Sequence, residues 1–221
     1  IVLVILGLLL GGVLTGQSLI RAAELRSVST DYSRYLAAVN TFRDKYFAIP
    51  GDMNNATQFW QRMTATADCV NNSSATTNSA GVCDGNGTGV IDSAAAGSQS
   101  GEIFQFWRQL ALAGLVEGSY SGQAGSGGTL HMTTSNVPKS KLSNGLWGVR
   151  FVVVGVFAGS AGDLFSANYG NIMQFGAAVT NAENATSILK PEEAWNIDTK
   201  LDDGRPATGR VMVRNYGTCT N

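Results

Sequence analysis

The most regular pattern of apolar and polar positions lies at the start of the chain. Residues 1–14 read IVLVILGLLLGGVL and contain no charged side chain. From residue 17 to residue 47 there is no proline, and apolar residues recur at every third or fourth position, as on one face of an amphipathic helix. Pro50-Gly51 then predicts the end of the helix. The apolar stripe of this second part comprises Leu25, Val28, Tyr32, Tyr35, Leu36, Val39, Phe42 and Tyr46.

The two parts predict one continuous helix that has to be buried in two different ways. At 1.5 Å per residue, about 47 residues would reach about 70 Å, far longer than an ordinary globular helix. We expect residues 1–20 to lie in lipid or among identical helices, since about 20 apolar residues cross a bilayer. Residues 21–49 should pack on a head formed by residues 50–221; a buried core helix is the alternative for the apolar run. The side chains expected inside a bundle of such helices are Ile1, Val4, Ile5, Leu8, Leu9, Val13 and Leu14.

The remainder of the chain predicts an α+β head with a small antiparallel sheet, extra helices and long loops. Helices are expected after capping residues or a first-turn proline, and strands where β-branched residues dominate. Stretches rich in Gly, Ser, Asn and Thr, at 65–100 and 120–128, are expected to be loops. In chain order we predict helices over 54–64 and 103–116, strands over 146–157 and 171–179, a short helix from Pro191, and an edge strand over 210–216.

Net charge and composition limit the classes of partner that the protein is expected to bind. Fifteen Lys and Arg residues oppose sixteen Asp and Glu residues, which gives a net charge of −1. Proteins that bind nucleic acid need a basic surface to displace counterions from phosphates, so no nucleic acid partner is expected. Charged residues make up only 14% of the chain, against roughly 25% in typical globular proteins. The polar surface therefore comes largely from Ser, Thr, Asn and Gln, as in many exported proteins.

Three cysteines in an exported protein predict one disulfide and one remaining thiol. A bond between Cys69 and Cys83 would close a loop of about 15 residues and stabilise the fold by roughly 3 kcal/mol in the chain-entropy account. It would fix a segment whose composition is otherwise that of a disordered loop. A bond that involves Cys219, and no bond at all, are the alternatives.

Directly after Cys83, the run DGNGTGVID places oxygen-bearing side chains at alternating positions. These side chains occupy positions one, three, five and nine of a calcium-loop pattern, with glycine at position six for the sharp turn. Position twelve is Ala95 rather than the usual glutamate, and a Gly/Asn turn beside a disulfide is the alternative. No cofactor is required, and a structural calcium ion is the one that these residues indicate. Its candidate ligands are Asp84, Asn86, Thr88 and Asp92.

Catalytic motifs are poorly represented, and we expect the protein not to be an enzyme. His131 is the only histidine, and its sequence neighbours include no carboxylate. The segments AGSGG and AGSAG around Ser126 and Ser160 do not match a nucleophile elbow, and the sequence has no phosphate-binding loop or dinucleotide fingerprint. The four tryptophans are more typical of a core than of a carbohydrate platform.

Four segments together resemble the type IV pilin and type II secretion pseudopilin family. They are GQSLIRAAELR (16–26), AIPGDMNNATQFW (48–60), FWRQLALAGLVEGSY (106–120) and PEEAWNIDTKLDDGRPATG (191–209). The resemblance implies a protein held in the bacterial inner membrane with its head outside the cytoplasm, which then polymerises with copies of itself into an extracellular filament or periplasmic pseudopilus. It also implies processing by a prepilin peptidase and assembly on a platform protein.

The start of the chain departs from the family pattern. Family members usually begin with an N-methylated aromatic or methionine residue and carry a glutamate at position five, where this chain has Ile5. The first acidic residue is Glu24, so the family's glutamate and methylated amine have no counterpart in this sequence. We therefore expect Ile1 to lie several residues inside the mature helix.

A second acidic group, Asp198, Asp202 and Asp203, lies near the end of the chain in the run DTKLDDG. Close carboxylates repel one another unless a cation or a basic side chain intervenes. Pseudopilins commonly hold a structural calcium in a C-terminal loop, so the resemblance implies that these carboxylates bind such an ion. Lys200 and Arg205 are the alternative partners.

The favoured hypothesis is a structural subunit of a pilus-like filament that polymerises through its apolar helix. Glycines within that helix would allow close helix approach. A membrane-anchored binding module, such as a minor pseudopilin or an adhesin-like protein, is one alternative. A monomeric single-pass exported protein or hydrolase is the other.

Overall fold

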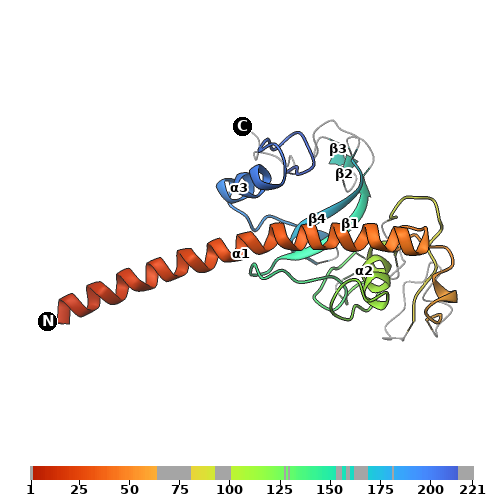
Figure 1. Ribbon diagram of the computed structural model, residues 1–221, viewed down its shortest axis with the longest axis horizontal. Coiled ribbons are helices and arrows are strands. Elements are labelled where there is room, and N and C mark those ends of the chain that lie inside the picture. The colour runs from red at the N-terminus through yellow and green to blue at the C-terminus, as the bar shows by residue number, and fades with distance from the viewer. Residues whose placement is uncertain are drawn as a thin grey trace.

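The computed structural model describes residues 2–63, 81–92, 101–126, 128, 130–152, 156–157, 160–161, 169–180 and 182–213 (Figure 1). A long N-terminal helix is followed by a head that mixes helices and strands, so the predicted α+β class is confirmed. In chain order the elements are α1 (Val2–Tyr46), the 3-10 helix η1 (Ala56–Gln58), α2 (Glu102–Leu112), β1 (Leu146–Val152), β2 (Val156–Phe157), β3 (Ser160–Ala161), β4 (Gly170–Val179), β5 (Ala182–Thr186) and α3 (Pro191–Leu201).

α1 is one unbroken helix of 45 residues, and only its second half lies against the head. In Figure 1 its N-terminal half projects away from every other element. Val28, Tyr35 and Phe42 are 3%, 1% and 0% exposed, and each lies seven residues from the next. A spacing of about two helical turns places them in one line that faces the head. The predicted stripe is confirmed, except that Leu36 at its edge is 37% exposed.

The core lies where α1 crosses α2 and the sheet. β4 is the central strand of an antiparallel sheet with the order β1-β4-β5, and β2 and β3 form a separate antiparallel pair. The Tyr35 ring of α1 lies edge-on to Trp107 of α2 and to Trp147 of β1, with ring centroids 4.9 and 5.6 Å apart. Such edge-on aromatic pairs stabilise a fold beyond the area that they bury. One tyrosine therefore joins three elements that are distant in sequence.

Several predicted elements are confirmed with shifted ends. The helix predicted over 103–116 is α2, which ends at Leu112 because the chain turns at Gly114, where φ is 73°. The strand predicted over 171–179 is β4, and Pro191 begins α3. The strand predicted over 146–157 is β1 followed by β2, with residues 153–155 outside the described residues.

Two predicted elements are wrong in the part of the chain that the structure describes. Over 54–63 only η1 is helical, because Asn55 makes no side-chain cap and the following residues pair with residue 82 instead. Met63 donates its N–H to the carbonyl of Val82, which donates its own N–H to the carbonyl of Gln61. Residues 210–213 form no strand, and the N–H of Val213 bonds the carbonyl of Pro206. Positions 64 and 214–216 of these two predictions lie outside the described residues.

Truncation of Phe42 tests whether this line of side chains anchors α1. Phe42 is fully buried, and its ring centroid lies 4.5 Å from that of Tyr46. We expect Phe42→Ala to lower the free energy of unfolding by about 3–5 kcal/mol, because it leaves a cavity in the core. Leu112→Ala, at a position that is 45% exposed, is the control and should cost about 0.5 kcal/mol. Urea denaturation in detergent micelles measures both, and equal losses would contradict the anchoring role.

Candidate functional site

The first candidate site is the uncovered apolar surface of α1. Within the described residues, one helix is long and apolar enough to cross a membrane, and none of its most apolar stretch is buried by the rest of the chain. Leu3, for example, is 84% exposed. Of the residues predicted inside a helix bundle, Ile5, Leu9, Val13 and Leu14 are exposed. Ile1, and the side chains of Val4 and Leu8, lie outside the described residues.

Small residues continue this surface along α1. A Cβ added to any of four glycines in the apolar half would meet no atom within 4 Å, so packing inside the protein does not require glycine there. On the second half, several exposed positions also carry small side chains. Small residues let another helix approach closely. The glycines are Gly7, Gly11, Gly12 and Gly16, and the later small residues are Ala23, Thr30, Ser33 and Ala37.

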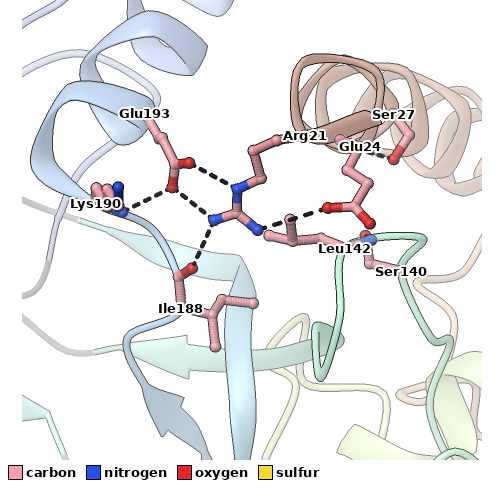
Figure 2. A network of polar contacts seen from close by, with 8 residues as sticks. All are labelled: Arg21, Glu24, Ser27, Ser140, Leu142, Ile188, Lys190 and Glu193. Atoms are coloured by element: carbon pink, nitrogen blue, oxygen red, sulfur yellow. Dashed lines mark hydrogen bonds and ion pairs between the residues drawn. The ribbon is translucent and has the colours of Figure 1, made fainter. Parts of the chain in front are cut away.

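A polar network joins α1 to α3 where α1 enters the head (Figure 2). The Arg21 guanidinium donates two hydrogen bonds of 2.7 Å to the carboxylate of Glu193, one from Nε and one from Nη2. Arg21 Nη2 also lies 3.3 Å from the carbonyl oxygen of Ile188, and Nη1 lies 3.6 Å from the carboxylate of Glu24. This paired geometry fixes direction as well as distance. It therefore sets how the head sits on the helix.

Glu193 is held in its charged form by this network. Its carboxylate is mostly buried and also accepts a hydrogen bond of 2.9 Å from the N–H of Lys190. The hydrogen bonds from Arg21 lower the pKa of Glu193 to about 2, with smaller contributions from the Lys190 N–H and from nearby positive charge. Glu193 thus caps the first turn of α3 and ties that turn to α1.

Two carboxylates hold the loop that contains the predicted calcium ligands. Asp52 accepts hydrogen bonds of 3.0 and 2.7 Å from the N–H groups of residues 88 and 89. Glu102, in the first turn of α2, accepts hydrogen bonds of 2.9 and 2.8 Å from the N–H groups of Asn86 and Asp92. Burial raises the pKa of Glu102 to about 7, against the opposing effect of these two N–H groups. The backbone of the loop is therefore fixed from both sides.

Hydrogen bonds join three of the four predicted calcium ligands of this loop, and the fourth bonds a residue of another segment. The Asp84 carboxylate accepts two hydrogen bonds of 2.8 Å from the N–H and the hydroxyl of Thr57. Asn86 donates from Nδ2 to Asp92 at 2.9 Å and accepts from the hydroxyl of Thr88 at 2.7 Å. Asn86, Thr88 and Asp92 are thus brought together, while Asp84 bonds Thr57. A calcium ion bound by all four stays a prediction.

The predicted acidic group at the end of α3 does come together. Asp198, Asp202 and Asp203 each offer a carboxylate oxygen within 4.8 Å of the others. Asp198 is 5% exposed, and its Oδ1 has no hydrogen-bond partner among the described residues. Burial and the charges of Asp203 and Asp202 raise the pKa of Asp198, although the N–H of Gly204 opposes this. Among the described residues, no ion pair joins Lys200 or Arg205 to these carboxylates.

The loop after α3 wraps around this acidic group. Asp203 accepts hydrogen bonds from the N–H of Arg205 at 2.9 Å and from the hydroxyl of Thr208 at 2.6 Å. The N–H of Arg210 bonds Asp202, and a side chain at Gly209 would collide with the same carboxylate. An unpartnered, buried carboxylate oxygen beside two other carboxylates is costly without a positive charge. Three acidic oxygens in a pre-shaped loop suit a hard divalent cation such as calcium.

Other predicted residues lie apart from these sites. Cys83 is buried and belongs to a disulfide. Cys69 and Cys219 lie outside the described residues, so the pairing of Cys69 with Cys83 stays a prediction. His131 Nδ1 lies 3.1 Å from the carbonyl oxygen of Val179, a contact with the backbone rather than with a carboxylate.

Comparison with models of known protein families, with curated proteins and with solved structures finds no match to this chain. Functional inference therefore rests on the residues and their geometry.

Four residues that organise these sites carry no functional signal in the sequence. Arg21 and Glu193 are 172 positions apart, and an acidic residue in a first helical turn is already explained by the helix dipole. The same explanation covers Glu102. Asp52 follows the Pro-Gly turn, and nothing in its neighbourhood predicts that it accepts bonds from residues 88 and 89.

The link between Arg21 and Glu193 predicts a pH dependence of stability. Because the folded state lowers the pKa of Glu193 from 4.5 to about 2, the link stabilises fully above about pH 4.5 and is lost as the pH falls toward 2. Glu193→Gln should therefore lower the melting temperature at pH 7, and its difference from the wild type should shrink between pH 4.5 and pH 2. The exposed neighbour provides the control Glu192→Gln, which should change little at any pH. A difference for Glu193→Gln that is constant from pH 7 to pH 2 would refute the link.

Proposed function

We propose that this protein is a structural subunit of a pilus-like filament, held in a bacterial inner membrane before assembly. The observation that carries the proposal is the exposed apolar surface of α1, which the head leaves uncovered. Burial of apolar surface contributes about 25 cal/mol per Å², so a surface of this size does not stay in water. Lipid would cover it before assembly, and copies of the same helix would cover it afterwards.

The small residues along α1 favour helix partners as well as lipid. In water, glycine weakens a helix by about 1 kcal/mol relative to alanine, so helix propensity does not explain four glycines in this run. The four glycines have open space around them in the single chain. They would allow another helix to approach closely, and this accounts for glycine at these positions. The exposed small residues beyond residue 20 extend the same surface into the part of α1 that carries the head. A copy could thus pack along both halves.

A charge placed in the apolar half tests this proposal. In a core of apolar helices an arginine would be buried without a partner, which is strongly unfavourable. We expect Leu9→Arg to abolish filaments that electron microscopy detects in shear fractions of cells producing the full chain. Leu112→Arg, at an exposed leucine of the head, is the matched control and should leave filaments intact.

A second variant separates helix packing from membrane anchoring. Gly12→Leu keeps the helix apolar, so it should still partition into the membrane fraction, but it blocks close helix approach and should reduce filament yield. The proposal fails if the unaltered chain forms no filaments, or if Leu9→Arg assembles as well as Leu112→Arg.

We also propose that the three aspartates at the end of α3 bind a divalent cation, with calcium as the best match to an all-oxygen site. The buried, unpartnered Oδ1 of Asp198 favours this role. The ion would be structural, because it would fix the loop over 202–210 on the end of α3.

Calcium titration tests the cation site. A ligand that binds only the folded state at 100 times its dissociation constant stabilises it by about 2.7 kcal/mol. We expect calcium to raise the melting temperature of the wild type in detergent and to have little effect on Asp198→Asn. Asp92→Asn is the control, because it reports on the loop over 84–92. A calcium response that persists in Asp198→Asn and disappears in Asp92→Asn would assign the ion to that loop instead.

A further inference from the structure

The residue that follows α1 has a conformation usually adopted by glycine. Phe47 has φ of 54°, and its N–H closes the helix by bonding the carbonyl of Arg43 at 2.9 Å. Glycine is common at this position of a helix end because other side chains are strained there. A bulky aromatic residue at such a position is a backbone outlier, and outliers of this kind gather at functional surfaces.

The Phe47 ring gains no burial within the described part of the chain. It is 93% exposed, and it makes no ring contact among the described residues. The cavity beside it, of about 790 Å³, has a largely polar lining that includes Asn40, Arg43 and Asp44. Phe59, the next exposed aromatic residue, instead packs edge-on against Tyr46, with centroids 5.3 Å apart. A strained backbone and an exposed ring therefore coincide at Phe47, and no contact among the described residues compensates for them.

A groove of suitable size lies at the other end of the part of α1 that carries the head. Its volume is about 430 Å³, and Ile20, Ala23 and Thr30 contribute small or apolar groups to its lining. The same groove is lined by two basic side chains, Arg26 and Lys141, and by two acidic ones, Glu24 and Asp31. Among the described residues, Arg26 and Lys141 take part in no ion pair, and neither do Arg43 and Asp44 beside Phe47. Lys141 acts on Asp31 within the groove. The charges left without an ion pair among the described residues therefore include Arg26 at the groove and Asp44 beside Phe47, and these two have opposite signs.

We infer that Phe47 of one copy inserts into the groove around Ala23 of the next copy, with Asp44 placed against the basic residues Arg26 and Lys141. This inference rests on the proposed filament function and names one of its contacts. A knob and a groove on different parts of one surface form a heterologous contact, which builds an open helical assembly when the rotation between copies does not close a ring. Phe47 lies about 20 residues beyond the groove, so copies joined in this way would be staggered by about 30 Å along α1.

Phe47→Gly tests the contact without damage to the fold. Glycine relieves the strained backbone while it removes the ring, so we expect the variant to melt at the same or a higher temperature than the wild type in detergent micelles. Its filaments should nevertheless be at least 10-fold less abundant in shear fractions. Phe59→Ala is the matched control and should show the opposite pattern, with a lower melting temperature and filaments that still form.

Photo-crosslinking locates the contact directly. With p-benzoylphenylalanine in place of Phe47 in the full chain, irradiated filaments should yield intermolecular crosslinks to residues 20–31 or to Lys141. Crosslinks confined to other segments, or normal filaments from Phe47→Gly, would overturn this contact and leave the filament proposal standing. Absence of filaments from the unaltered chain would overturn both.

Discussion

One helix carries two apolar surfaces, and the described part of the chain covers only one of them. Val28, Tyr35 and Phe42 face the head, where Tyr35 joins α1 to α2 and β1 through aromatic contacts. The preceding apolar half of α1 receives no such cover. Because the helix is continuous, the head cannot fold back over this half without a break. The described part of the chain leaves this half uncovered, and the proposed function assigns its cover to lipid and to copies of the same helix.

Polar contacts fix the head to the helix at the boundary between these two surfaces. Arg21 follows the apolar half directly and is paired with Glu193 at the start of α3, so a charge lies where the apolar half of the helix ends. The far end of α3 carries the three aspartates, and a cation there would fix the loop that follows. α3 is thus tied at its first turn to α1 and organised at its last turn by the acidic group. Charged side chains thus attach α3 to α1, whereas aromatic side chains pack in the core where α1 crosses α2 and β1.

Local sequence patterns predicted much of this fold, whereas contacts between segments distant in the sequence were not predicted. The heptad spacing of Val28, Tyr35 and Phe42, and the first-turn proline of α3, are encoded by neighbours in the sequence. The three aspartates also came together because a helix end brings nearby positions close. By contrast, two sets of contacts depend on how distant segments meet. They are the pairing of Arg21 with Glu193 and the hydrogen bonds that Asp52 accepts from residues 88 and 89. The helix expected over 54–64 failed for the same reason, since pairing with residue 82 outweighs helix propensity there.

The most direct test of the account is sedimentation of the purified full-length chain as detergent is withdrawn. If copies of α1 cover one another outside lipid, the account predicts large elongated particles in detergent-free buffer, which dissociate into single molecules when detergent is restored. A chain that stays monomeric and soluble without detergent would contradict it, because its apolar half would then need no cover at all.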